Sequence, residues 1–285
     1  MPRPAAPPAP PLLTHPDRLL WPEEGISKRM LADYFAAVAP RLLRHVAGRP
    51  LSLLRAPRGI GGARFFQRHP GPGLPPALRR VALPGAERPF LAVEDAGGLA
   101  ALAQIAAIEL HPWGARAEDP ERPDRLVLDL DPAEDLPFAR VVEAALALRE
   151  RLRRHGLAPF CKSTGGKGLH LVVPLLPRAF WPEVAAFARA VCEAMAAEAP
   201  ERFTTSPRRR DRAGRILLDH LRNERGASAI APWSPRARAG APVAMPLAWE
   251  EVGPDLDPRG VTLATAPARR DPWDGFEAAA RPLPG

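Results

Sequence analysis

The sequence is poor in several features, and each shortage excludes a class of protein. Two cysteines in 285 residues are too few for a disulfide framework or for a metal site built from thiolates. No apolar run approaches the roughly 20 residues that a membrane-spanning helix requires. The first residues also lack the apolar core of a signal peptide. We therefore expect an intracellular protein that has no membrane partner.

Lysine is the scarcest charged residue. Only three of the 40 basic residues are lysines, at Lys28, Lys162 and Lys167, and arginine supplies the rest. Such a bias indicates a codon composition under which tolerant surface lysines drift to arginine. The three that remain are therefore candidate functional residues, with chance survival as the alternative for each. The net charge of +8 favours a polyanionic partner such as nucleic acid, and charge that serves only solubility is the alternative.

The hydrophobic pattern predicts strands interspersed with helices, which is typical of an α/β or α+β protein. We predict strands at 49–57, 63–69, 90–95, 108–113, 126–132, 158–163, 169–176 and 215–221, and helices at 27–48, 96–106, 137–155 and 181–197. We expect a disordered Pro/Ala-rich tail at 1–13 and a single domain at 14–285. That domain would comprise an N-terminal part (14–115), a sheet that carries the site (116–240) and a Pro-rich connection (241–285).

The tetrapeptide DLDP occurs twice, and the two copies lie in different settings. At 129–132 it ends the apolar run LVL, so Asp129 and Asp131 are predicted to share one face of a strand, about 6.5 Å apart. Carboxylates this close repel unless a proton or cation lies between them, and hard divalent cations prefer such ligands. The alternative is that Asp131 caps the next turn and that Asp129 is solvated at the end of the strand. The copy at 255–258 follows Gly-Pro, so we expect a turn there.

A third carboxylate, Asp219, ends the apolar run ILL in the same way. Taken alone, a residue in this position is more often a solvated strand end. If neighbouring strands bring Asp219 beside Asp129 and Asp131, the three carboxylates match the donor set that bridges two divalent ions.

The segment STGGKGLH at 163–170 has the composition of a phosphate-binding loop. It combines the hydroxyls of Ser163 and Thr164 with three glycines, whose amides can approach an anion, and with Lys167. A strand follows it, so it is not the GxxxxGK[ST] loop, and an ordinary Gly-rich turn is the alternative. His170 alternates with core leucines and faces the opposite side, where we predict a triphosphate ligand.

These motifs stand in the order HPWGARAEDPERPDRLVLDLDP, STGGKGLHLVVPL and ILLDHLRNERGASAIAPWSPRAR. In this order they resemble the polymerase domain of bacterial DNA ligase D, in the archaeo-eukaryotic primase superfamily. HPDRLLWPEEGISKRML and RPLSLLRAPRGIGGARFFQRH extend the resemblance over residues 14 to about 275. Several long motifs in one order make it specific.

The resemblance implies a primase-polymerase fold, with a central, mostly antiparallel sheet flanked by helices. It implies a DNA-dependent nucleotidyltransferase that extends or fills DNA ends in bacterial non-homologous end joining, in the cytoplasm at the nucleoid. The substrates would be NTPs or dNTPs, with ribonucleotides preferred, and the cofactors two divalent cations, Mn²⁺ preferred or Mg²⁺. The implied partners are DNA with a double-strand break or gap and a 5′-phosphate, a Ku-type end-binding protein and a separate DNA ligase.

The family's functional residues carry over in three groups. The metal carboxylates resemble Asp129, Asp131 and Asp219. The nucleotide contacts resemble His111, Thr164, Lys167, His170 and Arg236, with Ser163 in the same loop. The DNA contacts resemble Phe65 and Phe66 near the template, Arg55 near the active site, and Arg18 with Lys28 at a 5′-phosphate pocket.

Three positions depart from the family pattern. Thr164 stands where Ser is more usual and keeps the hydroxyl, whereas Arg18 stands where Lys is usual and changes the geometry. Ala227 stands where some relatives carry a basic residue, which puts that contact in doubt. The sequence shows neither the KxDG motif of a ligase nor a His-rich nuclease segment, so we expect a free-standing polymerase.

Two other classes stay open at this point. One is a protein of the same fold that bridges DNA ends without synthesis. The other is a metal-dependent nuclease, because three carboxylates and two ions also suit phosphodiester hydrolysis. A nuclease has less need of a triphosphate cradle, which favours the polymerase.

Overall fold

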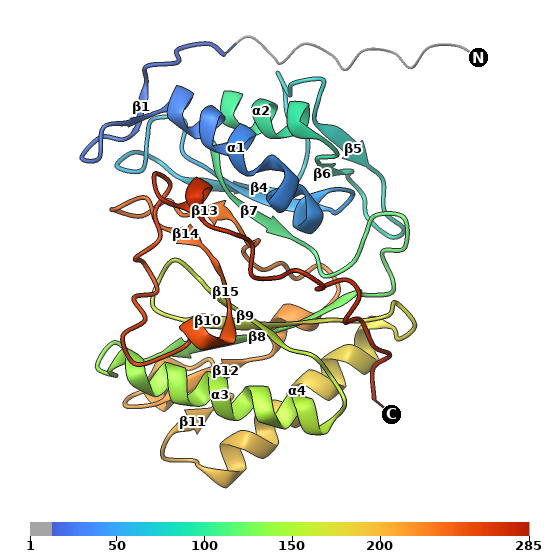
Figure 1. Ribbon diagram of the computed structural model, residues 1–285. Helices are drawn as coiled ribbons and strands as arrows, with labels where there is room; N and C mark the ends of the chain where they lie inside the picture. The colour runs from blue at the N-terminus through green and yellow to red at the C-terminus, as the bar shows by residue number, and fades with distance from the viewer. Residues whose placement is uncertain (1–12, 285) are drawn as a thin grey trace.

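The computed structural model describes residues 13–284, and two sheets lie between two pairs of helices (Figure 1). Helices α1 and α2 cover one end of the molecule, and α3 and α4 cover the other. The tail predicted at 1–13 falls, apart from Leu13, outside the described residues. Within 13–284, no helix is both long and apolar enough to cross a membrane.

The N-terminal half contains an antiparallel five-stranded sheet in which β7 pairs with β3, beside the order β4-β3-β6-β5. Its elements are β1 (Leu19–Trp21), β2 (Ile26–Ser27), α1 (Lys28–Val46), β3 (Leu51–Arg55), β4 (Phe65–Gln67), β5 (Arg79–Val81), β6 (Phe90–Ala92), α2 (Ala96–Gln104) and β7 (Ala107–Pro112). The Ser27 hydroxyl caps α1 by accepting from the Met30 amide at 3.3 Å. As predicted, α1 continues through Pro40.

The second sheet has six strands in the order β11-β12-β8-β10-β9-β15, and only the β11–β12 pair is parallel. The elements of this half are β8 (Arg125–Pro132), α3 (Phe138–Arg154), β9 (Phe160–Ser163), β10 (Leu169–Pro174), α4 (Trp181–Glu198), β11 (Phe203–Thr204), η1 (Arg209–Asp211), β12 (Ile216–Asp219) and η2 (Leu221–Asn223). The predicted mostly antiparallel sheet flanked by helices is therefore confirmed. The five-stranded sheet is a second sheet beside it.

Alternation along β8 separates the core from the site. Leu126, Leu128 and Leu130 are buried in the cluster that α3 and α4 form against the sheet. The intervening residues, Asp129 and Asp131 among them, therefore point to the opposite face. That face is directed toward the five-stranded sheet, so the polar residues of β8 lie between the two halves.

The segment at 233–284 is packed structure, and it includes most of the Pro-rich connection predicted at 241–285. Its elements are β13 (Ser234–Pro235), β14 (Val243–Ala244), β15 (Pro246–Leu247), η3 (Trp249–Glu251) and η4 (Ala266–Ala268). Trp233 and Val243 are buried in the N-terminal core, and Trp273 packs in a cluster with Val127 of β8. The second DLDP copy lies outside strands, as predicted, and Asp257 accepts there from the Arg259 amide.

Candidate active site

Two of the three predicted metal carboxylates face each other across neighbouring strands. Asp219 of β12 is the register partner of Asp129 of β8, and Asp131 lies one pleat further along β8. Directly opposed residues of an antiparallel pair have Cβ atoms about 4.5–5.5 Å apart. The fold thus brings Asp129 and Asp219 together, and it places Asp131 on the same face.

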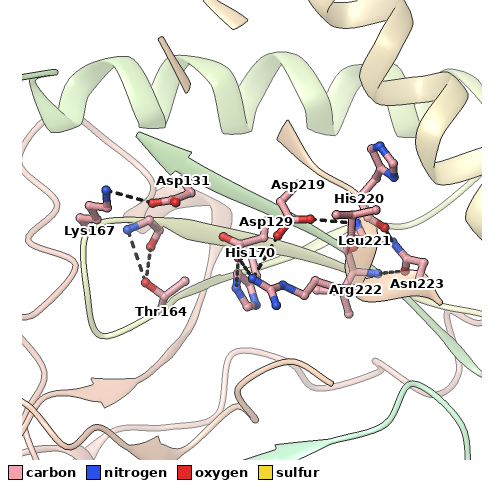
Figure 2. A network of polar contacts seen from close by, with 12 residues as sticks. Asp129, Asp131, Thr164, Lys167, His170, Asp219, His220, Leu221, Arg222 and Asn223 are labelled. Atoms are coloured by element: carbon pink, nitrogen blue, oxygen red, sulfur yellow. Dashed lines mark hydrogen bonds and ion pairs between the residues drawn. The ribbon is translucent and has the colours of Figure 1, made fainter. Parts of the chain in front are cut away.

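Basic side chains occupy the positions between these carboxylates (Figure 2). Arg222 Nη2 lies 3.3 Å from Asp129 Oδ2 and 3.0 Å from Asp219 Oδ2. Asp131 turns toward Lys167, whose Nζ is 3.2 Å from Oδ1, and its Oδ2 is paired with Arg212. Within residues 13–284, no three acidic, histidine or cysteine side chains are grouped closely enough to hold a metal ion as they stand.

The two opposed carboxylates have different proton affinities. Burial alone would raise the pKa of Asp129, but His170 and Arg222 outweigh it and hold that pKa at about 2. Burial raises the pKa of Asp219, and the neighbouring Asp129 charge adds to the shift while Arg222 opposes it. Asp129 is therefore ionised at neutral pH, and Asp219 is the carboxylate that its surroundings push toward the protonated form.

These carboxylates fit a divalent ion to different degrees. The Oδ2 atoms of Asp129 and Asp219 already converge on one cationic nitrogen, and carboxylate oxygens are the ligands that hard cations prefer. Asp131 fits the same site only after Lys167 and Arg212 release its carboxylate. The role of all three as metal ligands stays a prediction.

The predicted phosphate-binding loop is the hairpin between β9 and β10, and two of its glycines are required, one by a close contact and one by its backbone conformation. A Cβ on Gly168 would lie 2.4 Å from the Leu130 carbonyl oxygen, and Gly165 has a φ of +62°. Thr164 closes the loop, because its hydroxyl donates to the Gly168 carbonyl at 3.1 Å. Lys167 donates to the Pro132 carbonyl at 2.8 Å, which holds the ammonium beside β8.

Ser163 was predicted to contact the nucleotide, but it does not line the cleft. Its side chain is buried and its hydroxyl accepts from the Met245 amide at 3.1 Å, so it holds the loop onto the C-terminal segment. Alternation along β9 explains this: Lys162 points to the face that carries the site, and Ser163 points away from it. Only Thr164 of the predicted hydroxyl pair lines the cleft.

His170 and Lys162 extend the carboxylate pair into a row across four strands. His170 pairs in register with Asp129 on one side and with Lys162 on the other, and its Nε2 lies 3.4 Å from Asp129 Oδ2. Burial lowers the pKa of His170 to about 4, and Lys162 contributes to the shift. Burial lowers the pKa of Lys162 to about 7. Within the described residues, neither Lys162 Nζ nor His170 Nδ1 has a hydrogen-bond partner.

Glu109 joins two predicted nucleotide contacts. It is buried on β7, where its Oε2 lies 2.9 Å from His111 Nε2 and its Oε1 accepts from Arg236 Nε at 3.1 Å. Arg236 also donates to the Thr164 carbonyl. His111 and Arg236 therefore reach the phosphate-binding loop as one connected group.

Many of these groups line one cleft of about 220 Å³. Its lining includes His111, Asp129, Asp131, Thr164, Lys167, His170, Arg222 and Arg236. The fold thus gathers five predicted nucleotide contacts and two predicted metal ligands around one space. Asp219, which pairs with Asp129, lies next to it.

The predicted template contacts lie beside this cleft on the five-stranded sheet. Phe65 and Phe66 of β4 are exposed by 45% and 59%, which is unusual for adjacent aromatic side chains. The Phe66 ring packs edge-on against His111 with centroids 5.4 Å apart, which links this surface to the cleft. Arg55 donates to the Ile105 carbonyl at 2.8 Å and stacks over Phe65.

The predicted 5′-phosphate pocket lies at the start of α1. Lys28 is buried, and its Nζ donates to the Thr14 carbonyl at 2.8 Å and to Gln104 Oε1 at 2.9 Å. Burial lowers the pKa of Lys28, and Arg18 lowers it further. The first amides of α1 already have partners, because those of Lys28 and Arg29 donate to the carbonyls of Arg18 and Pro16.

Three residues of the site escaped the sequence analysis. Arg212 and Arg222 reach the carboxylates from turns, where no periodic pattern shows the direction of a side chain. Glu109 carried a usable signal, because it stands in an apolar strand and alternates onto the same face as His111.

Comparison with known proteins identifies the family. Residues 27–274 match the model described as LigD, primase-polymerase domain. The chain is 42% identical over 272 residues to the multifunctional non-homologous end joining protein LigD of Pseudomonas aeruginosa, covering 93% of this chain and 32% of that protein. It is 30% identical over 251 residues to the bifunctional LigD of Bacillus subtilis, covering 87% of this chain and 40% of that protein.

A solved structure agrees with these matches. The polymerase domain of Mycobacterium tuberculosis ligase D, in complex with DNA, superposes with a TM-score of 0.87 and 32% identity, covering 94% of this chain and 98% of that one. The chain spans about a third of the length of the Pseudomonas relative. It belongs to the family of LigD primase-polymerase domains.

Proposed function

We propose that the chain is a DNA-dependent nucleotidyltransferase that extends or fills DNA ends in non-homologous end joining. One observation carries the proposal: the opposed Asp129 and Asp219 adjoin the same cleft as Thr164, Lys167 and Arg236. A polymerase needs both a metal-binding group and a triphosphate-binding group at one place. The DNA-bound Mycobacterium relative supports DNA as the partner.

The chain's own residues would bind and orient an incoming nucleoside triphosphate. Lys167 in the loop and Arg236, which contacts the Thr164 carbonyl, supply positive charge to one cleft, and a polyphosphate requires several converging donors. His170 is neutral at neutral pH because its pKa is about 4, so it would act as a hydrogen-bonding group and not as a cation.

Asp129, Asp131 and Asp219 would hold two divalent cations, Mn²⁺ preferred or Mg²⁺. When bound, such ions activate the primer 3′-hydroxyl and stabilise the leaving pyrophosphate. For this arrangement Asp131 must leave Lys167 and Arg212. Lys167 is then free to contact phosphate, so nucleotide binding and metal binding favour the same rearrangement.

The DNA would lie along the five-stranded sheet. The exposed rings of Phe65 and Phe66 are suited to stacking on template bases. Lys28 and Arg18 would bind the 5′-phosphate of a break or gap. A preference for ribonucleotides, recruitment by a Ku-type protein, cooperation with a DNA ligase and action at the bacterial nucleoid complete the proposal.

One incubation tests the proposed activity against its alternatives. The protein is mixed with a primer-template, nucleotides and Mn²⁺, and product length is measured. Longer products support the polymerase, shortened ones a nuclease, and unchanged primers with bridged ends a binding protein. Asp131→Ala should abolish extension while DNA binding persists. Asp257→Ala alters the same position of the second DLDP copy and should extend normally.

A further inference from the structure

Arg222 occupies the position that a cation should take between two of the carboxylates. Asp129 and Asp219 are register partners on one face, and like charges this close are unfavourable without a cation between them. A single guanidinium nitrogen of Arg222 lies 3.3 Å from one carboxylate and 3.0 Å from the other. Figure 2 shows this guanidinium reaching both carboxylates, while Asp131 is turned away toward Lys167.

The backbone that carries Arg222 is fixed independently of its side chain. The Leu221 amide donates to Asp219 Oδ1 at 2.8 Å. Asn223 joins the turn to β8, because its amide group donates to the Val127 carbonyl and accepts from the Val127 amide, both at 2.7 Å. The Arg222 side chain itself is 41% exposed. It can therefore swing out of the carboxylate pair while the turn keeps its place.

A divalent ion and this guanidinium cannot share the carboxylate pair. A small divalent ion such as Mg²⁺ binds carboxylate oxygens at about 2.0–2.1 Å, closer than Arg222 approaches, and two cations on the same oxygens repel each other. Arg222 also lines the cleft and the neighbouring small cavity, so space exists beside its present position.

We propose that Arg222 is an exchangeable counter-ion, which holds Asp129 and Asp219 in the metal-free protein and is displaced when a divalent cation binds. This inference rests on the proposed metal site. Arg222 is a positioning residue in this scheme: it keeps the two carboxylates aligned without metal, and its displacement sets how much metal is required to load the site.

The first test measures Mn²⁺ binding directly, from the electron paramagnetic resonance signal of free Mn²⁺, without DNA or nucleotide. Arg222→Gln should bind Mn²⁺ about two- to fivefold more tightly than the parent, the range of a partly exposed ion pair. Arg225→Gln is the matched control, because Arg225 lies nearby in the chain and pairs with the distant Glu121. It should change the affinity by less than about twofold. Asp219→Asn should weaken binding.

The second test separates a counter-ion from a general effect of charge. In EDTA, Arg222→Gln should lower the Tm, and the same substitution should lower it less in an Asp219→Asn background. Added Mn²⁺ should raise the Tm of Arg222→Gln more than that of the parent.

These measurements distinguish the counter-ion role of Arg222 from the metal site on which it rests. If Asp219→Asn weakens Mn²⁺ binding but Arg222→Gln leaves it unchanged or weaker, the counter-ion role is overturned and the metal site stands. If Asp219→Asn leaves Mn²⁺ binding unaffected, the metal site and the counter-ion role fall together.

Discussion

Glu109 and Arg236 lie 127 residues apart in the sequence, yet Glu109 Oε1 and Arg236 Nε are 3.1 Å apart. The Ala237 amide donates to the same oxygen at 3.0 Å, and His111 contacts the other carboxylate oxygen. Burial would raise the pKa of Glu109, but His111 and Arg236 outweigh it and hold the pKa at about 2. A permanent anion therefore positions two predicted nucleotide contacts that lie far apart in the sequence.

Glu109→Gln should raise the nucleotide KM several-fold, because Gln keeps the shape of Glu but loses the charge that orients Arg236 and His111. DNA affinity should change little, since Glu109 is buried. Extension assays at varied nucleotide concentration, with separate DNA-binding titrations, measure both quantities. Glu121→Gln breaks an exposed ion pair with Arg225 and is the control. An unchanged KM in Glu109→Gln would show that the ion pair is only structural.

The sequence was sufficient to predict the direction of a side chain wherever strand alternation decides it. Asp129 and His170 follow or interrupt apolar runs, so their shared face could be predicted before the register was known. The same rule, applied along β9, would have shown that Ser163 points away from the cleft.

The positions of side chains that reach the site from distant turns could not be predicted in this way. Arg212 and Arg222 reach the carboxylates from turns whose path depends on tertiary contacts, such as the Asn223 bonds to β8. At the start of α1, residues 16 and 18 fold back to accept from the first helix amides. Both outcomes depend on non-local hydrogen bonds, which no periodicity encodes.

Lys167→Ala should raise the nucleotide KM or lower turnover far more than it weakens DNA binding. Its ammonium lies in the cleft, 3.2 Å from Asp131. A lost contact between charged groups is worth about 1.5–3 kcal/mol, which is roughly ten- to a hundredfold in KM. Steady-state extension and DNA titrations give the comparison. An equal loss of DNA affinity would instead make Lys167 a DNA contact.

Lys162→Met should change how stability depends on pH. The pKa of Lys162 is about 7 in the folded protein against an ordinary value of 10.5, because burial disfavours the charge. Between these values the unfolded chain binds a proton that the folded protein does not, so the free energy of unfolding should rise with pH. Below pH 7 the full cost of burying the charge is present.

Met fills a similar volume without the charge, so the variant should lack this rise and be at least as stable as the parent at pH 6. Urea unfolding of both proteins in EDTA, from pH 6 to pH 10, measures the difference. Parallel curves for parent and variant would mean that Lys162 keeps its ordinary proton affinity in the folded protein.

The last prediction concerns selection of a phosphorylated break by Lys28. A terminal 5′-phosphate carries more charge than a backbone phosphodiester, and Lys28 and Arg18 place two cations together at the start of α1. Because the first amides of α1 are occupied, the preference must come from these side chains. The parent should bind gapped DNA with a 5′-phosphate a few-fold to tenfold more tightly than without it, up to about 1.4 kcal/mol. Lys28→Ala should lose this preference, whereas Arg29→Ala, which removes an exposed charge from the same turn, should keep it. A parent without the preference, or a Lys28→Ala variant that retains it, would place the phosphate pocket elsewhere.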